Sequence, residues 1–294
     1  MKPVQRLVLG AVVAFAILGA IVGCDGMFTT EINLEDNTVA VAGVSVYPKS
    51  LTVDVANSVN DLEAEVVPSN ASNQLIHWES SDESVVTVDA AGVLSAVFPG
   101  TATITVVTDE GSHTETATVH VSHTGPAGGF VFYRDEAGKH DWTYLEAAPP
   151  ETEWTEKPWG GAGIEVGASA QGDEVGDGAA NSAAIVAAFG DQEPTDNRED
   201  YAARLADELE YVHEAVAYDD WFLPSRGELS LMYENLHAAG VGGFNDEEFE
   251  VYWSSSETNS NTAKTVSFLH GTGAGTISHN KSNFAFRVRA IRAF

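Results

Sequence analysis

The stretch Trp221-Phe-Leu-Pro-Ser-Arg-Gly-Glu-Leu229 decides how the second half of this 294-residue chain is organised. Pro224 disfavours the α region for the residue before it, so the segment that precedes Pro224 is predicted to be extended. Ser225, with Glu228 three residues later, is the pattern of a capping box, in which each residue satisfies a backbone N–H group of the other. We therefore predict a helix that begins after Ser225 and ends near Ala239.

Strand-like segments lie on both sides of this helix. Residues 130–133 and 142–146 are rich in aromatic and β-branched side chains and are separated by turn formers, which predicts a hairpin. Residues 252–257 and 284–292 predict two more strands. Alternation along the last strand places Arg287 and Arg289 on one face.

Two further helices are expected between the hairpin and residue 221. Asn181 is a good N-cap for a short helix over 182–189, which Gly190 would end. Apolar residues at helical spacing predict a second helix over 199–215. Helices and strands together indicate an α+β domain.

Several ordered motifs of this region resemble one family, the domain first named at the C-terminus of the Legionella collagen-like adhesin. The motifs are Gly125-Pro-Ala-Gly-Gly-Phe-Val-Phe-Tyr133, Trp142-Thr-Tyr-Leu-Glu-Ala-Ala148, residues 221–229, Tyr252-Trp-Ser-Ser-Ser-Glu257 and Arg287-Val-Arg-Ala-Ile-Arg292. The resemblance implies a C-type-lectin-like fold over residues 123–294, related to that of the formylglycine-generating enzymes. It also implies a role in binding sulfated glycans.

A different pattern occupies residues 39–122. Short segments of period two alternate with turn residues, and no segment has helical spacing, which predicts an all-β sandwich. The predicted strands cover residues 44–47, 62–67, 85–88, 101–106 and 116–121. The turn formers of residues 122–129 mark the predicted domain boundary.

The motifs of this region resemble the group 2 bacterial immunoglobulin-like domain. They are Pro68-Ser-Asn-Ala, His77-Trp78-Glu-Ser-Ser-Asp82, Gly92-Val-Leu-Ser and Phe98-Pro-Gly-Thr-Ala-Thr-Ile-Thr-Val106. The resemblance implies an Ig-like sandwich with a stalk-like role at a cell surface, and in some members binding of host molecules. Trp78 is expected to anchor the core of the sandwich.

The first 24 residues have the organisation of an export signal. A basic start is followed by an apolar run and then by small residues that end at Cys24, which is the one cysteine of the chain. Ile21-Val-Gly-Cys24 resembles the lipobox of bacterial lipoproteins, which implies removal of residues 1–23 and lipid attachment at Cys24. Residues 24–38 are then a tether. A plain secretory signal and an N-terminal membrane helix are the alternatives.

Composition narrows the classes of partner. The chain has 14 Lys and Arg against 44 Asp and Glu, which gives a formal net charge of −30. Such a surface repels nucleic acid and anionic lipid headgroups, so neither is an expected partner. A single cysteine excludes an intramolecular disulfide, so the domains depend on ordinary cores.

Arginines and tryptophans of the second domain are the candidate ligand contacts. Arg287 and Arg289, with Arg292 nearby, could form a forked clamp for carboxylate or sulfate. Alternatively they form internal ion pairs, for which Glu228 is the first candidate partner. Trp221 and Trp253 are either core residues or, if exposed, surfaces for stacking a sugar ring.

Other kinds of site are less well supported. No cofactor or metal is expected. Asp173, Glu174 and Asp177 could supply calcium ligands, but their spacing differs from that of known loops, and a solvated acidic loop is the alternative. Glu193-Pro194 matches only the start of a sugar-binding motif. The serines 254–256 lack the surroundings of a hydrolase nucleophile, and the domain lacks the paired cysteines of formylglycine-generating enzymes.

The sequence thus predicts a lipid-anchored protein of the bacterial cell envelope, facing outside the cytoplasm. An Ig-like domain carries a C-type-lectin-like domain that acts in non-enzymatic recognition or adhesion, with a glycan or a surface protein as ligand. The alternative is a structural envelope protein without a small ligand.

Overall fold

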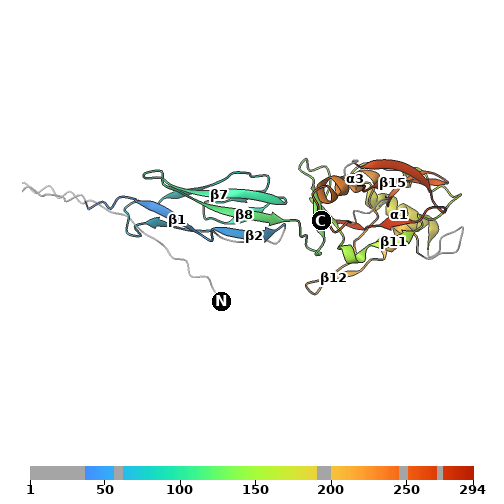
Figure 1. Cartoon of the computed structure of the whole chain (residues 1–294), viewed down its shortest axis with the longest axis horizontal. Helices are drawn as coiled ribbons and strands as arrows, with labels where there is room; N and C mark the ends of the chain where they lie inside the picture. The colour runs from blue at the N-terminus through green and yellow to red at the C-terminus, as the bar shows by residue number, and fades with distance from the viewer. Residues whose placement is uncertain (1–36, 56–61, 191–199, 245–250, 270–273) are drawn as a thin grey trace, which may run out of the picture. The chain divides into compact units, whose positions relative to one another are not determined.

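The computed structural model describes residues 37–55, 62–190, 200–244, 251–269 and 274–294 (Figure 1). The predicted signal 1–23, Cys24 and the tether up to residue 36 lie outside the described residues, and so does Glu193-Pro194. Among the residues that are described, no helix is long and apolar enough to cross a membrane. The compact part of the chain is Val39–Phe294.

The first domain is built of strands, as its alternating sequence predicts. They are β1 (Gly43–Tyr47), β2 (Ser50–Asp54), β3 (Glu63–Val67), β4 (Ile76–Ser80), β5 (Val86–Val88), β6 (Leu94–Ala96), β7 (Gly100–Thr108) and β8 (Thr114–Ser122). One sheet has the order β2-β8-β7-β4, and β1 pairs with β3 and β5 with β6. β1 packs against β7 and β8, so the β1-β3 pair and the four-stranded sheet enclose the core.

Period two decides which side chains enter this core. Along β7, Ala102, Ile104, Val106 and Thr108 are buried while the residues between them are more exposed. The resulting cluster consists of aliphatic side chains, including Val53, Leu62, Leu94 and Val119. Burial of these apolar groups stabilises the sandwich without any directional contact.

Trp78 packs against this core but is itself half-buried. Its ring lies beside Gly92, where an added Cβ would come within 3.2 Å of the ring and 2.3 Å of the Leu62 carbonyl oxygen. Gly92 also has φ +88°, a conformation that favours glycine. The glycine of the Gly92-Val-Leu-Ser motif therefore leaves room for the Trp78 ring beside it.

All five strands predicted for the first domain are present, and three strands were not predicted. These are β2, β4 and β6. β2 has the burial pattern of an edge strand, with Val53 as its buried residue, and its pairing with β8 is parallel. Such short strands present too few apolar residues for their period to be recognised.

The second domain contains two sheets, a hairpin and three α-helices among its described residues. The sheet β18-β10-β9 joins β9 (Phe130–Arg134) and β10 (Tyr144–Ala147) to β18 (Ile291–Ala293). The predicted hairpin of residues 130–146 is confirmed. The larger sheet has the order β11-β17-β14-β15-β16, formed by β11 (Trp154–Lys157), β14 (Val251–Asn259), β15 (Thr262–Ser267), β16 (Gly275–Asn280) and β17 (Phe286–Val288).

The predicted last strand, residues 284–292, is divided between the two sheets. Residues of β17 pair with β11 and β14, whereas β18 pairs with β10. Arg289 and Ala290 connect the two strands and are buried. The prediction of one continuous strand is therefore wrong, because the chain crosses from one sheet to the other at these two residues.

Helix α1 (Gly178–Phe189) begins four residues earlier than predicted and ends at Gly190 as predicted. Asn181 lies inside the helix and is not its cap. Its side-chain amide donates to the Gly172 carbonyl (2.8 Å) and accepts from the Gly172 N–H (3.2 Å). Asn181 therefore does not cap the helix; its side chain holds the loop that contains Gly172.

The helix predicted over residues 199–215 is shorter than expected. Helix α2 covers Ala202–Asp207, and a hairpin of β12 (Tyr211–His213) and β13 (Val216–Tyr218) follows. Glu214 and Ala215 form its tip, both with positive φ. Hairpin turns of this kind usually contain Asn or Gly. Glu and Ala favour helices instead, so nothing in the sequence indicated a hairpin here.

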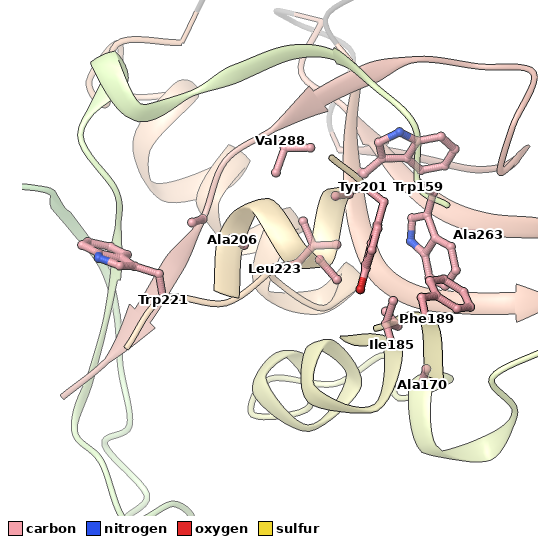
Figure 2. Packing of buried hydrophobic residues seen from close by; sticks show 14 of the residues in the cluster. Trp159, Ala170, Ile185, Phe189, Tyr201, Ala206, Trp221, Leu223, Ala263 and Val288 are labelled. Atoms are coloured by element: carbon pink, nitrogen blue, oxygen red, sulfur yellow. The ribbon is translucent and has the colours of Figure 1, made fainter. Parts of the chain in front are cut away.

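Helix α3 (Arg226–Met232) continues into a π-helical turn, Tyr233–His237, which confirms the predicted helix after Ser225. Figure 2 shows the core that α1 covers, with Phe189 and Tyr201 toward one end and Trp221 at the other. Phe189 makes edge contacts with both Trp159 and Tyr201. This packing places the sheet β11-β17-β14-β15-β16 beside α1 and α3.

Candidate functional site

The capping box that the sequence predicts is present. The Ser225 hydroxyl accepts from the Glu228 N–H (3.2 Å), and the Glu228 carboxylate accepts from the Ser225 N–H (2.7 Å). Glu228 also accepts from the Gly176 N–H at 2.8 Å. Burial raises the pKa of Glu228, although the backbone donors oppose this shift. Glu228 is therefore occupied by backbone groups and is not the partner of the arginines.

Arg287 and Arg289 share a different carboxylate, that of Glu153. Arg287 Nη1 lies 2.7 Å from one carboxylate oxygen, and Arg289 Nη1 lies 3.0 Å from the other. The Tyr252 hydroxyl donates to Glu153 as well, at 3.0 Å. The internal ion pair is confirmed, and its predicted partner, Glu228, is wrong. Glu153 precedes β11 and lies 134 residues from Arg287, so sequence spacing gave no signal for it.

Arg289 is buried at the point where the chain leaves β17. Its side chain is fully covered, Nη2 donates to the Gly242 carbonyl, and the guanidinium lies over the Phe244 ring at 4.9 Å. Desolvation lowers the pKa of Arg289, and Glu153 opposes this shift. A covered cation of this kind positions the polypeptide and has no free face for an anionic ligand.

Arg292 points to other partners, as strand alternation predicts. It forms a forked pair with Asp220, with both N–O distances at 2.8 Å, and a bond to Glu146 at 3.2 Å. Glu146 also accepts from the Gly129 N–H at 2.7 Å. Arg292 and Glu146 therefore hold the turn that opens the second domain.

The two tryptophans proposed as stacking surfaces are core residues. Trp253 has no exposed surface and donates its indole N–H to the Lys157 carbonyl (2.9 Å). Trp221 is 2% exposed and donates to the Tyr218 carbonyl (3.0 Å). A sugar ring needs an open aromatic face, so the structure removes both side chains from the candidate ligand contacts.

A buried pair that sequence reasoning missed joins Lys281 to Glu257. Both side chains are fully covered, and Lys281 Nζ lies 2.5 Å from Glu257 Oε1. Lys281 also donates to the Ile164 carbonyl (3.0 Å) and lies over the Trp159 ring (4.4 Å). Glu257 accepts from the N–H groups of residues 166 and 167. The pair fixes the loop that follows β11 to the end of the sheet.

The acidic loop and the serine run have structural contacts. Asp173 forms ion pairs with Lys264 and Arg226, and the Asp177 carboxylate accepts from the Glu174 N–H. Across the described residues, no group of three or more His, Cys, Asp or Glu is arranged to hold a metal ion. The serines 254–256 are buried, and the hydroxyls of Ser254 and Ser256 donate to the Lys264 and Gly172 carbonyls.

A surface that was not singled out from the sequence lies at one end of the larger sheet. The β14–β15 turn and the β16–β17 turn are neighbours there, because Thr262 pairs with Asn280 and the Lys281 N–H donates to the Asn261 carbonyl (3.0 Å). The exposed polar side chains at these turns are Asn259, Asn261, Ser282 and Asn283. Together with Phe284 we call them the uncharged patch.

Phe284 is the exposed aromatic side chain of this patch, with 45% of its surface accessible. Its ring stacks on Phe286 (5.6 Å between centroids) and meets His279 edge-on at 4.9 Å. Burial lowers the pKa of His279, so its imidazole is neutral at neutral pH. The exposed amide side chains of Asn261 and Asn283 belong to the same two turns. The patch thus combines an open ring with uncharged donors and acceptors.

Comparisons with known proteins concern part of the chain. An Ig-like virion protein of Serratia phage KSP90 is 34% identical over 110 residues, which is 37% of this chain and 40% of that protein. An alpha-L-arabinofuranosidase of Bifidobacterium longum is 42% identical over 73 residues, 25% of this chain and 7% of the enzyme. An uncharacterised Clostridium acetobutylicum protein, 35% identical over 83 residues, is matched over 9% of its length. The chain therefore spans less than half of each of these relatives.

Among solved structures, a fimbrial protein of Bacteroides ovatus aligns with 84% of this chain and 69% of its own, at 11% identity and a TM-score of 0.37. An intimin mutant of EHEC O157:H7 aligns with 80% of this chain and 82% of its own, at 14% identity and a TM-score of 0.21. Such TM-scores do not establish a shared fold. The family described as bacterial Ig-like domain (group 2) matches residues 40–119, which coincide with strands β1 to β8. Residues 40–119 are therefore a group 2 bacterial Ig-like domain.

Proposed function

We propose that this protein is an exported, lipid-anchored surface protein that acts by non-enzymatic recognition or adhesion. In this proposal Cys24 carries the lipid, the Ig-like domain is a spacer, and the second domain, of C-type-lectin-like fold, contacts the ligand. The observation that carries the proposal is the uncharged patch around Phe284, on a domain in which the candidate residues Arg287, Arg289, Trp221 and Trp253 are engaged internally.

The relatives support the spacer role of the Ig-like domain. Proteins with matching segments include a virion protein and an arabinofuranosidase, whose names describe unrelated functions. A module shared by such different proteins is not the part that sets their activity. We therefore assign recognition to the second domain. Its net negative charge, with 11 basic against 29 acidic residues, argues against the sulfated glycans that the family resemblance implies.

Surface location and anchoring have a direct test. In intact cells that produce the full chain, an added protease should cleave the protein, and the membrane fraction should contain it. Cys24→Ala should release the protein from the membrane fraction or leave its signal uncleaved. The same substitution should not change the fold. Protection from protease in intact cells, or membrane partitioning and mature mass unchanged by Cys24→Ala, would contradict the proposal.

Recognition itself is tested by binding. The purified chain should bind a saccharide or a surface protein in array experiments. A folded chain that is exposed on cells but binds neither class would favour the structural envelope role instead.

A further inference from the structure

The two turns of the uncharged patch differ in composition from the rest of the chain. Residues 258–262 and 275–285 contain one charged side chain, Lys281, whereas acidic residues alone number 44 in the whole protein. Lys281 is fully covered and paired with Glu257. Glu165, in the loop that Lys281 holds, borders the patch and is engaged by Gln171 at 3.4 Å. These two turns of an acidic protein thus present a neutral polar surface.

We infer that the uncharged patch binds a neutral saccharide, with Phe284 as the stacking ring and the surrounding hydroxyl and amide groups as hydrogen-bond partners. The inference rests on the proposed function, because it specifies the ligand of the same domain. It assigns contact to the Asn261 and Asn283 side chains in addition to Phe284.

Saccharide chemistry matches the patch in two respects. A pyranose ring has an apolar C–H face that packs on an aromatic ring, and Phe284 offers an open ring supported from behind by Phe286. The ring hydroxyls both donate and accept, as do the amides of Asn261 and Asn283. Charged groups are not needed for such a ligand, and the patch has none that is exposed.

The turns are also held in place before any ligand arrives. The side-chain oxygen of Asn259 accepts hydrogen bonds from the backbone N–H groups of Asn261 (2.9 Å) and Thr262 (3.1 Å). The Asn280 side chain accepts in the same way from Ser282 and Asn283, both at 3.0 Å. Groups that are already ordered lose less conformational entropy on binding.

The experiment is a glycan array that contains neutral oligosaccharides and the sulfated form of each, probed with the purified chain. We expect binding to one or more neutral oligosaccharides and weaker binding to their sulfated forms. Titration calorimetry with the best neutral oligosaccharide should give the same Kd at low and at high NaCl concentration, because salt screens only charged contacts.

Matched variants locate the site. Phe284→Ala should weaken binding of that oligosaccharide about tenfold, which corresponds to about 1.4 kcal/mol. Phe284→Tyr keeps the ring and should bind nearly as the original chain does. Tyr47→Ala removes the other highly exposed aromatic side chain, on β1 of the Ig-like domain, and should change nothing. Asn283→Ala, at an exposed turn position, gives a second variant if Phe284→Ala does not fold.

Three results would overturn the inference. They are the absence of binding to any neutral oligosaccharide by the folded chain, preferential binding to sulfated forms, and neutral binding that survives both Phe284→Ala and Asn283→Ala. If the chain instead binds a surface protein, the inference fails and the proposed recognition function stands. If the chain is not exposed on cells, the proposed function fails whatever the array shows.

Discussion

The Ig-like domain and the second domain have cores of different chemistry. Among the described residues of the Ig-like domain, the one buried polar side chain is Thr108, whereas the second domain buries Glu146, Glu228, Lys281, Arg289 and Arg292. A core of aliphatic side chains tolerates small changes of shape, because apolar burial is not directional. A core with ionic groups depends on each partner, because an unpaired buried charge is costly. The first domain is therefore expected to tolerate substitutions that the second does not.

The largest expected effect is the loss of one member of a buried ion pair. Lys281→Met leaves Glu257 covered and without its cation, so the free energy of unfolding should fall by about 3–5 kcal/mol. Denaturant unfolding followed by tryptophan fluorescence measures this, since five of the six tryptophans lie in the second domain.

The double variant Lys281→Met/Glu257→Gln is the control for this prediction. It removes both charges, so it should recover part of the lost stability. A cost below about 1 kcal/mol for the single variant would show that the pair contributes little to stability.

A smaller effect is expected in the Ig-like domain. Ile104 is fully buried in β7, and Ile104→Val removes one methylene from the aliphatic core. The free energy of unfolding of this domain should fall by about 0.5–1.5 kcal/mol. Calorimetry of the purified chain measures it. A loss as large as that of Lys281→Met would remove the distinction between the two cores.

The smallest effect is a pH dependence that belongs to the second domain. Burial raises the pKa of Glu228 above its ordinary value, so the native state takes up this proton at a higher pH than the unfolded state. Stability should therefore rise as pH falls through the native pKa toward the ordinary value near 4.5.

Glu228→Gln isolates this contribution. His123 and His279, whose pKa values are lowered by burial, act in the opposite direction, but they are present in both chains and cancel in the difference. The difference in unfolding free energy between the original chain and Glu228→Gln should shift in favour of the original chain as pH falls from 7 to 5. A difference that is constant, or that shifts the other way, would show that Glu228 titrates normally.

The two domains also differ in how far the sequence predicts them. In the Ig-like domain the period of two in the sequence identifies five strands, and burial alternates clearly along the two longest, β7 and β8. In the second domain the capping box of Ser225 and Glu228 is a local interaction, and it was predicted correctly. Local patterns failed, however, at the Asn181 N-cap and over the helix predicted for residues 199–215.

The other failures depended on distant contacts. Glu153 meets Arg287 across 134 residues, and no spacing in the sequence indicates that pair. The last predicted strand divides at Arg289 because that residue is held by Glu153 and by the Gly242 carbonyl, both far away in the chain. The uncharged patch was overlooked because its two turns become neighbours only through the pairing of β15 with β16.

The central claim is that the arginines hold the second domain together while the uncharged patch contacts the ligand. One paired measurement tests it, namely the thermal midpoint and the oligosaccharide affinity of Arg287→Ala and of Phe284→Ala. Our account predicts that Arg287→Ala lowers the midpoint and keeps the affinity, because it breaks the contact with Glu153. Phe284→Ala should keep the midpoint and lose about tenfold in affinity. The opposite result, in which Arg287→Ala abolishes binding without loss of stability and Phe284→Ala binds normally, would contradict it.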